Sequence, residues 1–173
     1  MSKWNKQRAK EWYSDQKWLV GCNFLPSTAI NQLEMFQQET YDRETIKKEL
    51  GWAKNLGFNS LRVYLHDLLW RCDQKGFIDC LDNFLDICKG YYIRPILVLF
   101  DDCHRPYPKI GKQPLPVIGV HNSGWKQSPG VEMVQSIYEG KKSDDEVLRL
   151  KQYVQGLMDK FSGDERILMW DIY

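Results

Sequence analysis

Side chains of the kinds that bind hydroxyl groups and support acid–base chemistry stand in or beside apolar runs of this sequence. Arg62 and His66 lie in one run at even spacing, so they share a face if that run is a β-strand. Asp101 follows a second run, and Asp171 lies inside a third. A charge within an apolar strand costs several kcal/mol unless it is paired. We therefore expect an ion pair between Arg62 and Asp171, which is compatible with support for an active site or with a purely structural role.

The tetrapeptide "DDCH" at 101–104 consists of residue types that can all bind metal ions. Consecutive residues rarely converge on one ion, however, and no second cluster has the spacing of a zinc site. We therefore expect no metal centre and no cofactor, and we keep Asp101 and His104 as candidate substrate contacts. Asp101 and Asp102 are a poor catalytic pair, because neighbouring residues on a strand point to opposite faces.

The stretch "VHNSGW" at 120–125 offers a further group of candidate contacts. Trp125 is a candidate stacking platform for a sugar ring, and His121 and Asn122 are candidate partners of sugar hydroxyls. The alternative is a loop that packs on itself. The sequence is rich in aromatic residues, with seven Trp, nine Tyr and seven Phe, and such side chains serve equally in a core of large residues.

Four apolar runs alternate with amphipathic segments, and this pattern predicts a parallel β-sheet covered by helices. We expect strands at 18–26, 59–66, 94–100 and 167–173 and helices at 42–56, 77–90 and 143–163. Residues 101–142 hold five of the seven prolines and are expected to form a long loop after the third strand. Because α/β proteins build their sites at the C-terminal ends of strands, we place this loop on the functional side.

Length and hydrophobic content indicate one domain over residues 1–173, which the pattern above makes an α/β domain. The net charge is +1, with 24 basic and 23 acidic residues intermixed, so we expect no nucleic-acid partner. No apolar run reaches the roughly 18 residues of a membrane span, so we expect no membrane partner. The N-terminal stretch is polar and lacks the apolar region of a signal peptide. This predicts a cytoplasmic protein, or a periplasmic or secreted one if a signal peptide has been removed.

Four longer stretches resemble the first half of clan A retaining glycoside hydrolases, and in particular family-five-like proteins often labelled cellulase or 1,4-β-xylanase. The similarity runs from about residue 12 to residue 173. The stretches are "WLVGCNFLPSTAINQLEMFQ", "TIKKELGWAKNLGFNSLRVYL", "DDCHRPYPKIGKQP" with "GVHNSGWKQSPG", and "ILMWDIY". The resemblance implies a (β/α)8 TIM barrel, of which these residues supply the first four βα units, that is, a half barrel.

The resemblance also implies where the chemistry lies. In the family, the fourth strand leads into an Asn-Glu-Pro stretch whose Glu is the general acid/base, and the nucleophilic Glu comes from strand 7. Tyr173 would stand directly before that Asn, so both catalytic carboxylates are expected outside these 173 residues. Arg62 matches the family's strand 2 arginine, which supports the catalytic carboxylates. Asn23 is expected to point inward from strand 1, and His66 and Asp67 are candidate contacts to sugar hydroxyls.

Three functions remain open from the sequence. The first is a glycoside hydrolase acting on β-linked polysaccharide or oligosaccharide by retaining double displacement, with these residues alone expected to be inactive. The second is a non-catalytic carbohydrate-binding or self-assembling half barrel, which would form a homo-oligomer or pair with a second half. The third is a barrel of unrelated activity, since barrels support many chemistries.

Overall fold

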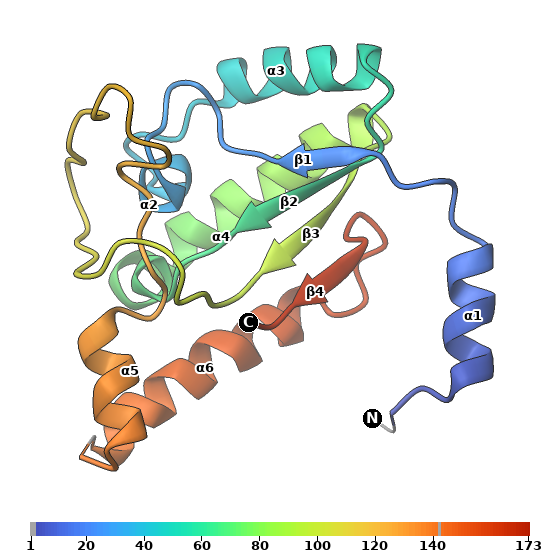
Figure 1. Cartoon of the computed structure of the whole chain (residues 1–173). Coiled ribbons are helices and arrows are strands. Elements are labelled where there is room, and N and C mark those ends of the chain that lie inside the picture. The colour runs from blue at the N-terminus through green and yellow to red at the C-terminus, as the bar shows by residue number, and fades with distance from the viewer. Residues whose placement is uncertain (1–2, 142) are drawn as a thin grey trace.

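Four short strands form a single parallel sheet in the computed structural model, which describes residues 3–141 and 143–173 (Figure 1). The strands are β1 (Gly21–Asn23), β2 (Ser60–Tyr64), β3 (Arg94–Val98) and β4 (Met169–Asp171). They follow one another in the order β1-β2-β3-β4, and all three neighbouring pairs are parallel. The expected parallel sheet in sequential order is therefore confirmed, and it is compatible with half of a barrel.

Three helices pack against one face of this sheet. They are α3 (Arg43–Asn55), α4 (Asp67–Gly90) and α6 (Asp144–Phe161), and α4 lies behind the sheet with the other two on either side of it (Figure 1). Ile46, Phe84 and Tyr153 from these helices share one buried cluster with Leu61 and Val63 of β2. We call the sheet face toward these helices the outer face and the opposite one the inner face.

Side-chain alternation along β2 separates the two faces. Leu61 and Val63 point into the helix-covered core, so Arg62 and Tyr64 must point to the inner face. The strand register extends this assignment to β1 and β4. Asn23 pairs with Arg62, and Tyr64 and Asp171 both pair with Val98 of β3, so Asn23 and Asp171 also face inward. Arg62 and Asp171, the charged side chains within apolar strands, thus lie on the one face that no helix covers among the described residues.

Helix α4 begins ten residues before the expected helix at 77–90. Its first turn starts at Asp67 and is capped by His66, and the backbone leaves helical geometry at Asp73, which has φ −150° and ψ 76°. Asp73 Oδ1 accepts a hydrogen bond from the amide of Gly76 at 2.9 Å, so the second part restarts with its own cap. The predicted helix corresponds to that second part.

The expected loop over 101–142 is shorter than predicted. Residues 131–138 form helix α5 (Val131–Tyr138), so the irregular segment after β3 ends near Gly130, and residue 142 lies outside the described residues. The helix has a clear apolar side, but no side chain caps its first turn. The start signal that identified α6, a capping box between Ser143 and Glu146, has no counterpart at Gly130.

Two further helices lie outside the predicted set. Helix α1 (Lys6–Ser14) buries none of its residues and stands apart from the sheet in Figure 1. Helix α2 (Gln32–Phe36) is only five residues long, and it follows β1 on the side where the strands end. Asn31 caps α2, is fully buried, and donates to Gln113 Oε1 and to the carbonyl of Gly124, both at 2.8 Å. It therefore fastens the segment after β3 to the N-terminus of α2.

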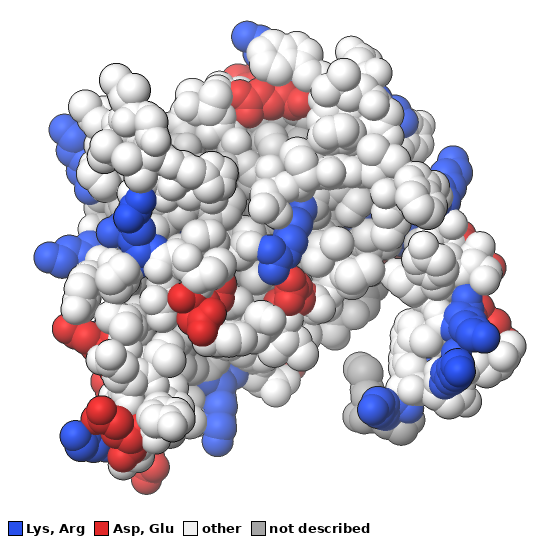
Figure 2. All heavy atoms as spheres, viewed as in Figure 1, with Lys and Arg blue, Asp and Glu red and all other residues white. Residues whose placement is uncertain are grey.

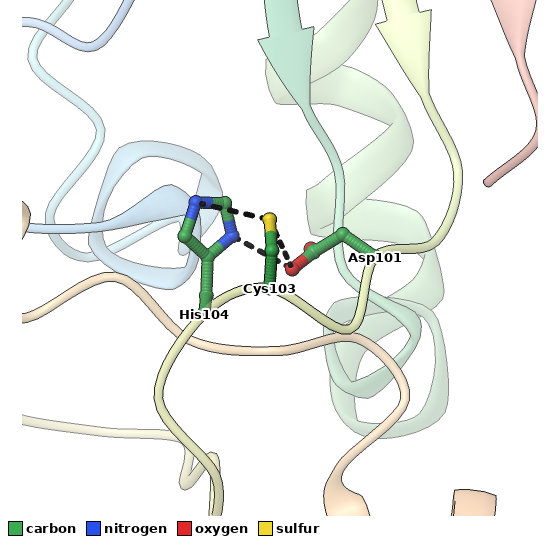
Figure 3. A group of neighbouring side chains, drawn as sticks. All are labelled: Asp101, Cys103 and His104. Carbon is green, nitrogen blue, oxygen red and sulfur yellow. Dashed lines mark hydrogen bonds and ion pairs between the residues drawn. The ribbon is translucent and has the colours of Figure 1, made fainter.

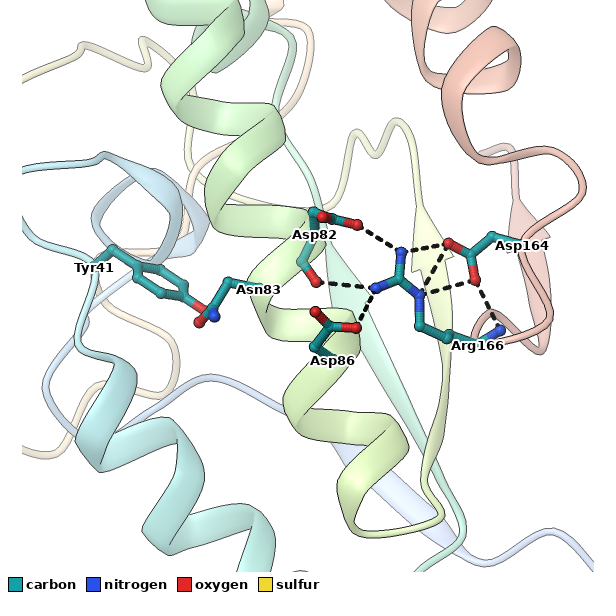
Figure 4. Close-up of polar contacts among 6 residues, drawn as sticks. All are labelled: Tyr41, Asp82, Asn83, Asp86, Asp164 and Arg166. Atoms are coloured by element: carbon teal, nitrogen blue, oxygen red, sulfur yellow. Dashed lines mark hydrogen bonds and ion pairs between the residues drawn. The ribbon is translucent and has the colours of Figure 1, made fainter.

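Arg166 fastens the approach to β4 against α4 at the opposite end of the strands (Figure 4). Its guanidinium donates to Asp82 and Asp86 of α4, each at 2.6 Å, and to Asp164. The hydrogen bonds with Asp164 raise the pKa of Arg166 above its ordinary value. On the α3 side of α4, Tyr41 Oη donates to Asn83 Oδ1 at 3.0 Å. Polar contacts on two sides thus hold α4 in place against the neighbouring elements.

The surface carries both signs of charge. Lys and Arg side chains are interspersed with Asp and Glu over the face seen in Figure 2. Among the described residues, none of the helices combines the length and the apolar character needed to cross a bilayer.

Candidate functional site

The inner face of the sheet carries an ion pair between β2 and β4. Arg62 Nε and Nη2 both donate to Asp171 Oδ2, at 3.0 and 2.6 Å. The side chains are 37% and 29% exposed, so the pair is partly open to solvent. Partial burial alone would lower the pKa of Arg62, but the hydrogen bonds with Asp171 raise it. The predicted pair between these residues is therefore confirmed.

Tyr64 connects this ion pair to an aromatic group. The guanidinium carbon of Arg62 lies 4.7 Å from the centre of the Tyr64 ring, and Arg62 Nη1 donates to Tyr64 Oη. On its other side, Tyr64 meets His104 and Trp125 edge-on, with ring centres 5.0 and 5.1 Å apart. Burial raises the pKa of Tyr64, which keeps its hydroxyl protonated. Because Tyr64 follows Arg62 by two residues, strand alternation alone places both on the inner face.

Trp125 comes from the segment after β3 and completes the aromatic group. Its ring centre lies 4.9 Å from that of His104, and only 8% of its surface is exposed. Trp125 packs with Tyr64 and Val98 in a small cluster on the inner face. The proposed stacking platform is thus largely covered by other side chains, so a sugar would meet only its exposed edge.

Asp101, Cys103 and His104 turn toward one another on the segment after β3 (Figure 3). His104 Nδ1 lies 2.7 Å from Asp101 Oδ1, and His104 Nε2 lies 3.9 Å from Cys103 Sγ. Their candidate ligand atoms all fall within 4.8 Å of one another. The argument that consecutive residues of "DDCH" would not converge is therefore wrong for three of the four. The chain turns immediately after β3, so strand alternation no longer separates these side chains.

His66 lies beneath this surface rather than on it. It is fully buried, and its Nδ1 is 3.2 Å from the amide of Leu68, where it caps α4. Asp67 is buried beside it and accepts hydrogen bonds from Ser128 Oγ at 3.0 Å and from Arg149 Nη1 at 2.6 Å. Burial alone would raise the pKa of Asp67, but its contacts with His66 and Arg149 lower it to about 2. Both residues therefore lie in the core behind the inner face and support that face from there.

Sequence reasoning did not single out Ser128 or Arg149. They lie 61 and 82 residues from Asp67 along the chain, so no local spacing links them to it. Together the three residues join the start of α4, the end of the irregular segment and α6. The sequence signal that remains is Asp67 itself, a carboxylate that directly follows an apolar strand and therefore needs a partner.

Three other candidates stand apart from the aromatic group. Asn23 ends β1 in register with Arg62 and is exposed, so it borders the ion pair on the inner face. His121 is exposed on the irregular segment. Asn122 has a φ of 48°, and its carbonyl accepts a hydrogen bond from the amide of Trp125 at 3.2 Å. Asn122 therefore shapes the turn that delivers Trp125, which fits the alternative of a loop that packs on itself.

Six residues thus form a continuous row across the C-terminal half of the sheet, which we call the inner-face row. Its members are Arg62, Tyr64, Asp101, His104, Trp125 and Asp171. The row combines hydrogen-bond donors and acceptors with aromatic side chains, but only Arg62 and Asp171 are partly exposed, and the other four members are largely buried. No protein-family model and no curated protein matches this chain.

Proposed function

We propose that this chain belongs to a retaining glycoside hydrolase that acts on β-linked glycans, and that it supplies the first four βα units of a (β/α)8 barrel. The observation that carries the proposal is the Arg62–Asp171 pair, with Tyr64 beside it, on the inner face of four parallel strands in sequential order. In such barrels the active site is built at the C-terminal ends of the strands. The resemblance assigns Arg62 the task of supporting the catalytic carboxylates.

The chemistry requires two carboxyl groups about 5–5.5 Å apart, one as nucleophile and one as acid and then base. The inner-face row offers no such pair, because Asp171 is bound to Arg62 and Asp101 is buried beside His104. The acid/base is expected on a Glu after Tyr173, and the nucleophile on a seventh strand. Arg62 would favour the ionised form of the nucleophile through its positive charge.

Substrate contacts come from the open side of the inner face. Asn23 is exposed there and Arg62 is partly exposed, so they can present an amide and a guanidinium to sugar hydroxyls. His104 and Trp125 are largely buried, so the apolar surface that they offer to a sugar ring is small. The substrate would be a β-linked oligosaccharide or polysaccharide.

The decisive experiment compares this chain with one extended through the expected Asn-Glu and four more βα units. Both are assayed on aryl β-glycosides and on xylan, glucan and mannan, with the anomeric configuration of the product followed by NMR. We expect no turnover by the 173-residue chain and hydrolysis with retention by the longer one. Turnover by the shorter chain would refute the argument about missing carboxylates.

Arg62→Ala in the longer chain tests the support role. We expect kcat to fall more than substrate binding, because Arg62 would hold the carboxylate geometry that matters in the transition state. Arg71→Ala, at an exposed position of α4, is the matched control and should leave both parameters unchanged. An equal loss for both variants would contradict the assignment.

A second candidate function is a non-catalytic half barrel that binds carbohydrate or assembles with itself. It is favoured by the exposure of β1, whose three residues all lie open at the edge of the sheet. Binding of oligosaccharides without hydrolysis by the longer chain, measured by amide chemical-shift changes, would support this function over the first.

A further inference from the structure

We propose that Asp101, Cys103 and His104 form a binding site for a divalent transition metal ion, with Zn²⁺ as the best match. The site lies at the end of β3, where the chain turns away from the sheet (Figure 3). It shares Asp101 and His104 with the inner-face row, but it does not depend on the proposed function. The three ligand atoms would be a carboxylate oxygen, a thiolate sulfur and one imidazole nitrogen.

The spacing of the donor atoms suits a single ion. Zn²⁺ bonds of about 2.0–2.3 Å in tetrahedral geometry place ligand atoms roughly 3.3–3.6 Å apart. Cys103 Sγ lies 3.9 Å from Asp101 Oδ1 and 3.9 Å from His104 Nε2, slightly wider than this. Asp101 Oδ1 and His104 Nδ1 are 2.7 Å apart, slightly closer. The two His104 distances involve different ring nitrogens, and one ion can bind only one of them. One candidate ligand atom from each of the three residues lies within 4.8 Å of the others, so the side chains would have to close by roughly 1 Å around an ion.

Two buried polar atoms at this place have no hydrogen-bond partner among the described residues. They are Asp101 Oδ2 and His104 Nδ1. The side chains of Asp101 and His104 are only 6% and 10% exposed. The 2.7 Å contact between His104 Nδ1 and Asp101 Oδ1 is an ion pair only if the imidazole is protonated, and no hydrogen bond joins the two atoms. Buried polar groups are nearly always paired, so a carboxylate and an imidazole left in this state indicate a missing partner, and a cation satisfies both.

The surroundings hold the ligands in place before an ion arrives. The imidazole of His104 packs against both Tyr64 and Trp125, with ring centres 5.0 and 4.9 Å away. The backbone of Asp101 is fixed by a hydrogen bond from its amide to the carbonyl of Ser128 at 2.7 Å. Such support around the ligands orients them and strengthens metal binding.

The donor set selects the class of metal. A mixture of sulfur, nitrogen and oxygen ligands suits a borderline ion such as Zn²⁺ and is poor for Mg²⁺ or Ca²⁺, which prefer oxygen. Cys103 is exposed, which gives the ion a path from solvent. On binding, the Cys103 S–H bond breaks, an S–metal bond forms and one proton is released to solvent. Three protein ligands leave one position of a tetrahedral ion open to water or a ligand hydroxyl.

Metal titration of the 173-residue chain tests the site. The protein is stripped with a chelator, dialysed against Zn²⁺ and analysed for metal content, and Co²⁺ is titrated in parallel because its spectrum reports thiolate ligation and tetrahedral geometry. We expect a single ion per chain and a thiolate-to-cobalt absorption band. Cys103→Ser should abolish the band and weaken Zn²⁺ binding by more than about tenfold, because mutating residues that merely support the metal-binding side chains already weakens binding by about that much.

Matched variants separate the site from other thiols. Cys22→Ser and Cys72→Ser alter exposed cysteines elsewhere and should leave metal content and the cobalt band unchanged. His104→Gln should weaken binding while circular dichroism confirms that the protein remains folded. The proposal is overturned if the wild-type chain takes up no ion, or if Cys103→Ser binds Zn²⁺ and Co²⁺ as the wild type does. Neither result bears on glycoside hydrolysis, which is measured without added metal.

Discussion

Arg62 and Asp171 lie 109 residues apart in the chain and meet on the inner face of the sheet, where two guanidinium nitrogens donate to one carboxylate oxygen. The contact joins the second and fourth strands across β3. It therefore ties these two strands together on the inner face and orients the guanidinium. The contribution of this contact to stability and its contribution to a functional site can be measured separately.

We expect Asp171→Asn to lower the free energy of unfolding by about 1 kcal/mol or less, because Arg62 is 37% exposed and water screens the pair. Urea unfolding of the wild type, Asp171→Asn, Arg62→Gln and the double variant gives the coupling energy. Lys75→Gln, which removes a more exposed pair with Asp79, is the control and should change nothing measurable. A loss above about 3 kcal/mol would mean that the pair behaves as a buried one.

The buried carboxylate of Asp67 should matter far more. Asp67→Asn removes the negative charge opposite Arg149, whose side chain is mostly buried. Breaking a buried pair from one side costs about 3–5 kcal/mol, and we expect a loss in that range by urea unfolding. Asp145→Asn, in the first turn of α6, is the control and should cost only a few tenths of a kcal/mol. Equal losses in the two variants would contradict a central role for Asp67.

The lowered pKa of Asp67 predicts a specific acid sensitivity. The pKa is about 2 in the folded protein against an ordinary value of 3.8, so the unfolded state takes up the proton more readily. The stabilisation is therefore complete above about pH 4 and is lost as the pH falls through about 2. We expect the stability difference between wild type and Asp67→Asn to shrink over this interval. A constant difference from pH 6 to pH 2 would assign the pH dependence to other groups.

Gly156 of α6 should tolerate no side chain, because a β-carbon there would lie 2.0 Å from Cη2 of Trp70 on α4. Overpacking of this kind costs about 1–3 kcal/mol, which exceeds the roughly 1 kcal/mol that Ala gains over Gly in a helix. We expect Gly156→Ala to lower the melting temperature. Gly90→Ala, where no atom lies within 4 Å, should be neutral or stabilising. Adding Trp70→Leu to Gly156→Ala should recover part of the loss if the contact is the cause.

Self-association of the isolated chain is a further expectation. The residues of β1 are all exposed, and an open strand edge pairs readily with another chain. We expect the 173-residue protein to form dimers or larger species, with a second copy as the partner, in light scattering across a concentration series. Cys22→Lys would place a charge on that edge and should shift the population toward monomer. A wild-type protein that stays monomeric and unfolds cooperatively would contradict the expectation.

The outline of the fold was predictable because it rests on local patterns. Apolar runs and 3.6-residue periodicity located four strands and three main helices, and the alternation of strand and helix indicated a parallel sheet. Even spacing predicted that Arg62 and His66 share a face, and this was wrong for His66, because β2 ends at Tyr64 and His66 turns into the buried N-cap of α4. The shorter observed strands β1 and β4 each pair on one side only, so their ends are not held in the ladder. Helix α5 was missed because its start at Gly130 has no side-chain cap.

Convergence of distant groups was decided only by the tertiary structure. The position of Asp171 inside an apolar strand predicted that it needs a partner, whereas Arg149 became the partner of Asp67 only because α6 packs beside α4. Likewise, residue types in "DDCH" showed which groups can bind a metal, while the turn after β3 brought three of them together. Local sequence fixes the conformation of short segments through backbone and periodicity, whereas a site is made where several segments meet, and their meeting depends on the packing of the whole domain.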